Sequence, residues 1–294
     1  MSIRIVTDSN CDLPEAIIDR YNIAVVPFYI NIGRQSYLDG LEMSRAQFYE
    51  GLPHFDHHPM TSVPGPGTVV KMFEALAAEG ATEVLAIHIG SSLSAMVNSA
   101  RLAAEEFDTV PVRVFDSGNL TLGTGLQVIA AAEAVAQGRT MEEILAALHD
   151  MSRRTHCFAA LETVEFLRRS GRLTRFQSGL ASVLQIKPLL KMNAGIYDME
   201  RVRTNNGATQ RLLDLTEALG PLEQLAVVHT HNQERADALR ELAQHILPKE
   251  DVTLSAAVTP VIGTHIGPGA AGFVAVQARD TQAFSAKKEI EGDK

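Results

Sequence analysis

Two periodic patterns of apolar and polar positions alternate along the first half of this chain. Short runs rich in β-branched residues, bounded by turn formers, predict buried strands at residues 3–7, 23–30, 84–89 and 112–115. Between them, apolar residues spaced three and four apart predict helices at 69–78, 95–107, 123–136 and 140–154. Thr140 and Glu143 form a capping box at the start of the last helix. Strands that alternate with helices predict a parallel α/β sheet with helices on both faces.

The second half has a different pattern. Residues 187–192 and 196–202 are apolar runs joined by Asn193-Ala194-Gly195, which predicts a β-hairpin. Two more strands are predicted at 225–229 and 252–258, amphipathic helices at 208–219 and 233–246, and a final strand at 272–277. We therefore expect an α/β domain at residues 1–155, an α+β domain at 156–278 and a flexible polar tail at 279–294.

Composition excludes several classes of protein. With 294 residues, 46% of them hydrophobic, the chain can bury the core of two domains. Cys11 and Cys157 are the two cysteines, too few for a disulfide framework or a cysteine-rich zinc site, and typical of a reducing compartment. Since no signal sequence or membrane-spanning run is visible, we expect a cytoplasmic protein.

Charge is distributed unevenly. The formal net charge of −9 argues against nucleic-acid binding. Residues 153–211, however, contain 11 basic and four acidic residues, a charge of +7, which leaves −16 for the remainder. Such a segment either meets an anionic ligand or acidic partner, or simply forms a solvated face.

Hydroxyls and glycines cluster in three segments predicted to be loops, at residues 59–64, 90–94 and 263–269. Ligands of α/β sheets bind at the carboxyl ends of strands, where a helix N-terminus also attracts anions. Thr61 and Ser94 are thus candidate anion ligands, although both could be helix caps. His265 lies among close glycines that let the backbone turn and bring the imidazole to a ligand; the alternative is a structural histidine.

Other chemistries find little support. The close histidine pairs, His57-His58 and His229-Thr230-His231, lack the spacing of a zinc site on a helix, so no metal is expected. No Gly-x-Ser-x-Gly nucleophile elbow is present, and no Walker-type phosphate loop.

Five motifs occur in the order found in the DegV family of bacterial fatty-acid-binding proteins, and the chain resembles that family from about residue 3 to residue 276. They are Ile5-Val6-Thr7-Asp8-Ser9, Tyr37-Leu38-Asp39-Gly40, Thr61-Ser62, Gly171-Arg172 and Thr264-His265-Ile266-Gly267-Pro268-Gly269. The segments 171–174 and 185–190 also contribute to the likeness.

The resemblance implies two α/β domains that enclose one long-chain fatty acid, such as palmitate, near their junction. It implies that Thr61, Ser94 and His265 bind the carboxylate, and that Ser62, Arg172 and Arg203 support it or face a partner. It also implies an acyl carrier that presents the fatty acid to a separate fatty acid kinase, with no catalysis of its own, no cofactor and at most transient membrane contact. One departure is clear: after Ser94 the family usually continues Gly-Thr-Tyr, where this chain has Ala95-Met96-Val97.

Two rival functions stay open at this point. One is a small-molecule hydrolase or transferase that uses Ser94 and His265 in a cleft. The other is a lipid transport carrier without a kinase, which shares every binding residue with the leading hypothesis.

Overall fold

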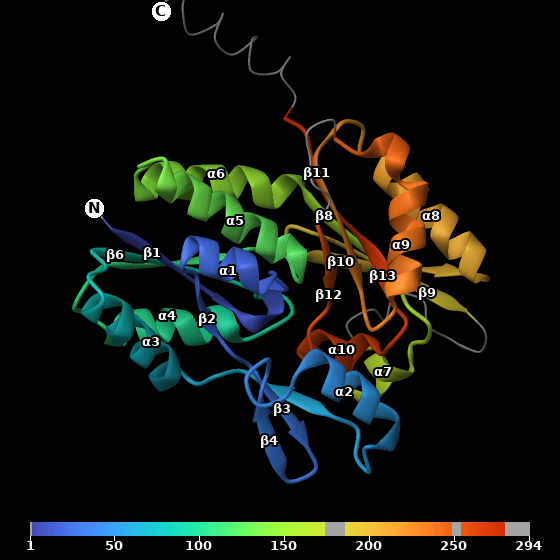
Figure 1. Ribbon diagram of the computed structural model, residues 1–294, viewed down its shortest axis with the longest axis horizontal. Helices are drawn as coiled ribbons and strands as arrows, with labels where there is room; N and C mark the ends of the chain where they lie inside the picture. Colours follow the sequence, from blue (N-terminus) through green and yellow to red (C-terminus); the bar gives the residue numbers. More distant parts are fainter. Residues whose placement is uncertain (1, 174–185, 249–253, 280–294) are drawn as a thin grey trace, which may run out of the picture.

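The first half of the chain builds a parallel four-stranded sheet. The computed structural model describes residues 2–173, 186–248 and 254–279, and Figure 1 shows two main sheets with helices between and around them. The order of the first sheet is β2-β1-β6-β7. Its strands are β1 (Ile3–Asp8), β2 (Ala24–Val26), β6 (Glu83–His88) and β7 (Val112–Asp116). The predicted parallel α/β architecture is confirmed.

A six-stranded sheet follows, with the order β10-β9-β8-β13-β11-β12. Its pairs are antiparallel except β11 with β12. The predicted hairpin forms its edge. The strands are β8 (Thr155–Ala160), β9 (Lys187–Asn193), β10 (Ile196–Val202), β11 (Leu222–His229), β12 (Ser255–Ala257) and β13 (Ala271–Gln277).

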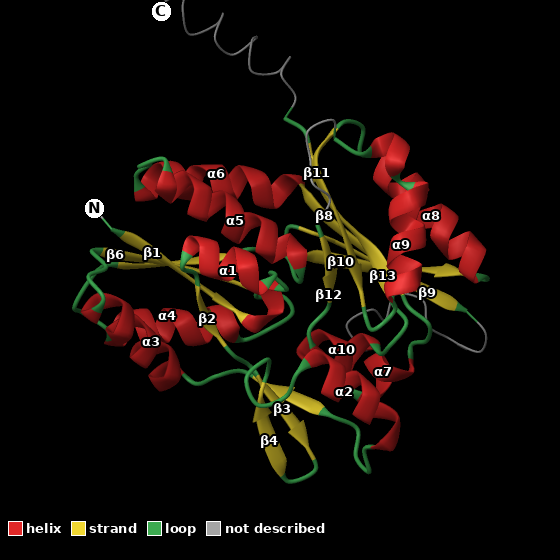
Figure 2. Ribbon diagram, in the orientation of Figure 1, coloured by secondary structure: helices red, strands yellow, loops and turns green. Residues whose placement is uncertain are grey.

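Helices separate and cover the two sheets as layers (Figure 2). α3 (Pro66–Ala78) and α4 (Met96–Glu106) pack on one face of the parallel sheet. α1 (Glu15–Tyr21), α5 (Leu122–Ala136) and α6 (Met141–Arg154) share a core with the other face and with the six-stranded sheet. α8 (Asn205–Glu217) and α9 (Gln233–Leu242) cover the far face of that second sheet. α5 is buried nearly all round because it lies between the two sheets.

A small antiparallel sheet was not predicted. It consists of β3 (Tyr29–Ile32), β4 (Gln35–Leu38) and β5 (Met60–Ser62), accompanied by α2 (Arg45–Gly51). The predicted single strand at 23–30 is wrong, because the chain leaves the parallel sheet after Val26 and enters this new sheet at Tyr29. Pro27 lies between the two strands and has no N–H to donate to a ladder.

The third predicted loop, residues 263–269, is also partly wrong. Pro260–Ile266 form helix α10, which begins with Thr259 as its N-cap and Pro260 in its first turn. Gly263 is helical, and it permits the close approach of the Tyr49 ring, which a Cβ atom would meet. The sharp turn comes at Gly267, whose φ of +77° favours glycine.

Some helices and strands end at other residues than predicted. The helix predicted at 233–246 ends at Leu242, before a short 3-10 turn at Gln244–Ile246. Residues 252 and 253 of one predicted strand, and 280–294 of the predicted tail, lie outside the described residues. Arg279, the first residue of that tail, is hydrogen-bonded to Asp150. The division of the chain into domains at residue 155 stays a prediction.

Candidate functional site

A cavity of about 320 Å³ lies where the parallel sheet, the small sheet and α10 meet. Five of its wall residues are polar and come from segments far apart in the sequence. They are Asn10 in the 3-10 turn after β1, Thr61 on β5, Ser94 before α4, Arg172 after α7 (Glu165–Arg169), and His265 on α10. The structure thus brings together four of the six predicted site residues.

Thr61 is a strand residue rather than a helix cap. It pairs with Ile30 in the small sheet, and its Oγ1 lies 3.0 Å from Nε2 of His265. His265 sits in the last turn of α10, so the helix and not a flexible loop sets its position. Two elements missed by sequence analysis therefore create this contact between Thr61 and His265.

The contact restricts where protons can lie. A threonine hydroxyl has one proton, and if Thr61 donates it to a ligand then its oxygen accepts from Nε2–H of His265. The same contact occupies Nε2 of His265, so this nitrogen is already engaged and does not serve as a base for Ser94 in this arrangement.

Ser94 accepts a hydrogen bond from the first turn of α4 and keeps an open donor. Its Oγ accepts a hydrogen bond from the backbone N–H of Met96 at 3.2 Å, and its own proton remains to be donated into the cavity. Met96 and Val97 are fully buried. The departure from Gly-Thr-Tyr therefore places apolar side chains in the core behind Ser94.

Arg172 supplies a cation to the wall. It follows Gly171, whose φ of +71° ends α7, and its Nη1 donates to the backbone oxygen of Ser170 at 2.6 Å. The guanidinium group remains charged at any physiological pH, so it favours an anion in the cavity.

Behind the polar groups, the walls become apolar. A second cavity of about 80 Å³ shares with the first the side chains of Leu93, Leu120, Leu190, Ile262 and Ile266. Its far part lies between the two sheets and reaches Cys157, Met192 and Tyr197. Together the two cavities form one space with a polar end and a narrow extension between mostly apolar walls.

The other two predicted residues lie apart from this cavity. Ser62 is exposed and accepts a hydrogen bond from Nδ2 of Asn31 at 3.0 Å. Arg203 is exposed beyond the end of β10. Neither is among the described residues that form the cavity wall.

Asn10 was not proposed from the sequence. It is completely buried, and it stands two residues after the Thr7-Asp8 step of the first motif. The one hint in the sequence was its position: Asn10 follows a predicted strand, and ligands of parallel sheets bind at the carboxyl ends of the strands.

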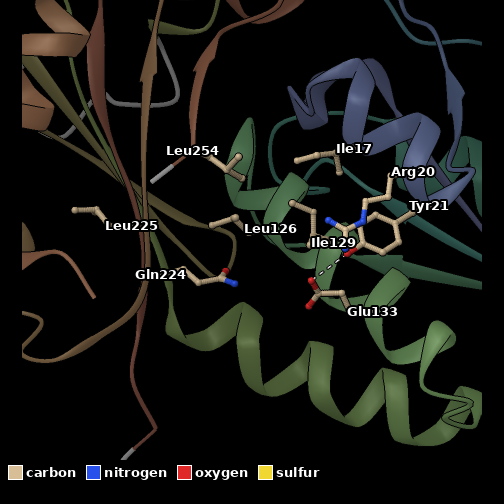
Figure 3. Close-up of a pocket in the computed structure, with 9 residues that line it drawn as sticks. All are labelled: Ile17, Arg20, Tyr21, Leu126, Ile129, Glu133, Gln224, Leu225 and Leu254. Carbon is tan, nitrogen blue, oxygen red and sulfur yellow. Dashed lines mark hydrogen bonds between the residues drawn. The ribbon is translucent and has the colours of Figure 1, made fainter. Parts of the chain in front are cut away.

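A different groove lies between α1, α5 and β11 (Figure 3). Its volume is about 250 Å³, and Tyr21 there donates a hydrogen bond to Glu133 at 3.2 Å. None of the predicted site residues lines it in the part of the chain described. Its hydroxyl, from Tyr21, is engaged with Glu133, and its cation, from Arg20, lies over the Tyr21 ring.

The described residues contain neither a candidate metal cluster nor a membrane-spanning helix. Among the described residues, no group of three or more His, Cys, Asp or Glu side chains is arranged to hold a metal ion. In the same part of the chain, every helix is too short or too polar to cross a membrane.

Comparison with known proteins gives the family. A family model described as "Uncharacterised protein, DegV family" matches residues 2–278. The chain belongs to the DegV family. A DegV domain-containing protein of Listeria innocua is 32% identical over 275 residues, which cover 92% of this chain and 97% of the relative.

Solved DegV structures share the fold over nearly the whole chain. A DegV family protein from Thermus thermophilus, described as binding fatty acid, has a TM-score of 0.86 and 32% identity, covering 95% of this chain and 100% of the other. DegV of Bacillus subtilis, described as a fatty acid binding protein, has a TM-score of 0.85 and 28% identity, with the same coverage.

Proposed function

We propose that this protein binds one long-chain fatty acid, such as palmitate, and presents its carboxylate to a separate fatty acid kinase. The observation that carries the proposal is the cavity itself: hydroxyls and a cation converge at one end, and the other end continues between mostly apolar side chains. The fatty-acid binding of the Thermus thermophilus and Bacillus subtilis relatives supports the same ligand class.

The tail supplies most of the affinity. About 15 methylene groups at ~0.8 kcal/mol each represent on the order of 12 kcal/mol of transfer free energy, an upper limit before the costs of ordering are subtracted. A hydrogen bond to the head group adds about 1–2 kcal/mol. Thr61 and Ser94 therefore mainly set the direction and depth of the bound chain.

The role of a carrier for a kinase follows from the position of the head group. In this proposal Arg172 and His265 lie beside the carboxylate, where a cation stabilises the charge that an acyl phosphate would add. The chain has no phosphate-binding loop for a nucleotide. We therefore assign phosphoryl transfer to the partner, and not to this protein.

Head-group variants test the binding proposal. After delipidation, palmitate affinity is measured for the natural protein, Thr61→Val, Ser94→Ala and the double variant. Each single change should weaken binding roughly tenfold, because one hydrogen bond of about 1–2 kcal/mol is lost. The double variant should also lose co-purifying fatty acid in mass spectra of solvent extracts.

Ser62→Ala is the matched control, since that hydroxyl faces Asn31 and not the cavity. It should bind palmitate like the natural protein. Undiminished affinity in a folded double variant would contradict the assignment of the head-group site.

A further inference from the structure

The side chain of Asn10 lies between a buried aspartate and the polar end of the cavity. It is completely buried. Its Nδ2 and its backbone N–H both donate to Oδ1 of Asp8, each at 3.0 Å. On its other side it forms part of the cavity wall with Thr61 and Ser94.

The hydrogen bonds determine which way the amide faces. Asp8 Oδ2 already accepts from Ile89 N–H at 3.0 Å and lies 3.0 Å from Nδ1 of His88. A carboxylate is an acceptor only, so Nδ2 of Asn10 must face it and Oδ1 must face away. Turning the amide over would place two acceptors in contact.

The amide oxygen is then left without a partner. Oδ1 of Asn10 is buried and has no hydrogen-bond partner among the described residues. Buried acceptors are nearly always satisfied, because an unpaired one loses its bond to water and gains nothing in return. Since Asn10 lines the cavity, a bound molecule is the natural partner.

That partner has to be a donor. An ionised carboxylate has no proton to give and would be repelled by the amide oxygen, whereas a protonated carboxyl group can donate its O–H. Resting on the proposed function, we propose that Asn10 accepts a hydrogen bond from the protonated carboxyl group of the bound fatty acid. Thr61 and Ser94 then donate to the carbonyl oxygen of the same group.

The groups around the head group shift the pKa of the bound acid in opposite directions. In the described part of the wall, Arg172 and His265 face the cavity, and the cation of Arg172 favours the ionised acid. Asp8 stands behind Asn10, with His88 behind it. Asn10 opposes Arg172, so it raises the pKa of the bound acid and lowers the cost of burying its head group.

Carbon-13 NMR of palmitate labelled at the carboxyl carbon tests this directly. Bound to the natural protein, the acid should titrate at a higher pH than when bound to Asn10→Leu, by about one pH unit, or tenfold in the proton-binding constant. Asn10→Thr keeps a donor for Asp8 and replaces the amide oxygen by a hydroxyl oxygen closer to the backbone, so it should show a smaller change in the same direction. Equal titration in the natural protein and a folded variant would overturn the proposal.

Neutral probes need no variant. Palmitamide carries a donor and an acceptor at every pH, and methyl palmitate carries acceptors only. The natural protein should bind palmitamide about tenfold more tightly than methyl palmitate, and Asn10→Thr should reduce that preference. Equal affinity for the two probes refutes the role of Asn10, even if palmitate binds well. Failure to bind palmitate at all would instead refute the proposed function.

Discussion

Asp12 joins three segments that are far apart in the sequence. Its backbone is in the left-handed region, with φ of 53°, and its side chain is completely buried. Oδ1 accepts from Thr259 N–H at 2.8 Å and pairs with Nη2 of Arg45 at 3.3 Å. One carboxyl group thus connects the first strand, α2 and the start of α10.

Burial makes this carboxyl group sensitive to pH. Desolvation raises the pKa of Asp12 from 3.8 to about 7, against the opposing effect of Arg45. A pKa that is higher in the folded state means that the folded protein binds the proton more tightly. The free energy of unfolding should therefore fall, through Asp12, as pH rises from about 4 to about 7.

Asp12→Asn should reduce this pH dependence, because an amide does not titrate. The measurement is urea denaturation of both proteins at pH 5 and pH 8. The loss of stability at pH 8 should be smaller in Asp12→Asn than in the natural protein. Asp198→Asn is the control, since the Lys191 partner lowers the pKa of exposed Asp198. An unchanged pH dependence in Asp12→Asn would contradict the role assigned to this group.

Among the elements, α5 shows how tightly the helices between the sheets are packed. A Cβ atom on Gly123 would lie 2.6 Å from Sγ of Cys157 on β8 and 3.1 Å from Cβ of Asn119. Cys157 also lines the apolar end of the second cavity. The close approach of α5 to β8 therefore shapes the space proposed for the acyl chain.

Gly123→Ala should destabilise the protein by about 1–3 kcal/mol, because overpacking in a dense core outweighs the ~1 kcal/mol that alanine gains in helix propensity. Adding Cys157→Ala should recover part of that loss by removing the sulfur atom. Urea denaturation of the single and double variants measures both effects. A more stable Gly123→Ala protein would show that this part of the core is not close-packed.

At the scale of the whole molecule, the small sheet and α2 bridge the two larger sheets. Arg45 donates to the backbone oxygen of Ala257, and the Tyr49 hydroxyl donates to that of Val258 at 3.0 Å. The two contacts reach the last residue of β12 and the connection from β12 to α10. They hold Thr61 and His265 in the same cavity wall, although 204 positions separate these residues in the sequence.

The basic segment is less uniform in three dimensions than in sequence. Arg168 and Arg169 pair with Glu165, and Lys187 pairs with Glu162. Arg201 and Arg203 are exposed and make no ion pair within the described ranges. Arg175, which contributed to the predicted charge of the segment, lies outside those ranges.

Charge reversal tests the proposed contact with a kinase. Arg203→Glu should lower kinase-dependent turnover of bound palmitate roughly tenfold, since it places a negative charge on a face proposed to meet an acidic partner. Arg172→Glu should lower both turnover and palmitate binding, because it also lines the cavity. Arg101→Glu on α4 is the control. Full turnover with a correctly folded Arg203→Glu protein would refute this docking role.

Local patterns account for a large part of the fold. Periodic apolar residues predicted β1, β6 and β7 and helices α3 to α6, because an element that buries a face has apolar residues at the period of its own secondary structure. The hairpin of β9 and β10 was equally clear from Asn193-Ala194-Gly195. Sequence also singled out Thr61, Ser94, Arg172 and His265 as candidates, partly through resemblance to the DegV family.

Tertiary structure alone decided which candidates meet. The strands of the small sheet have three or four residues each, too few for a period to be visible, and α10 contains a glycine that suggested a loop. Ser62 and Arg203 fall away from the cavity because strand register and chain direction place them elsewhere. The amide oxygen of Asn10 lacks a hydrogen-bond partner in the described part of the chain only because of how Asp8, His88 and the cavity are arranged around it. Whether a buried polar atom is satisfied depends on its neighbours in space, which no local sequence pattern specifies.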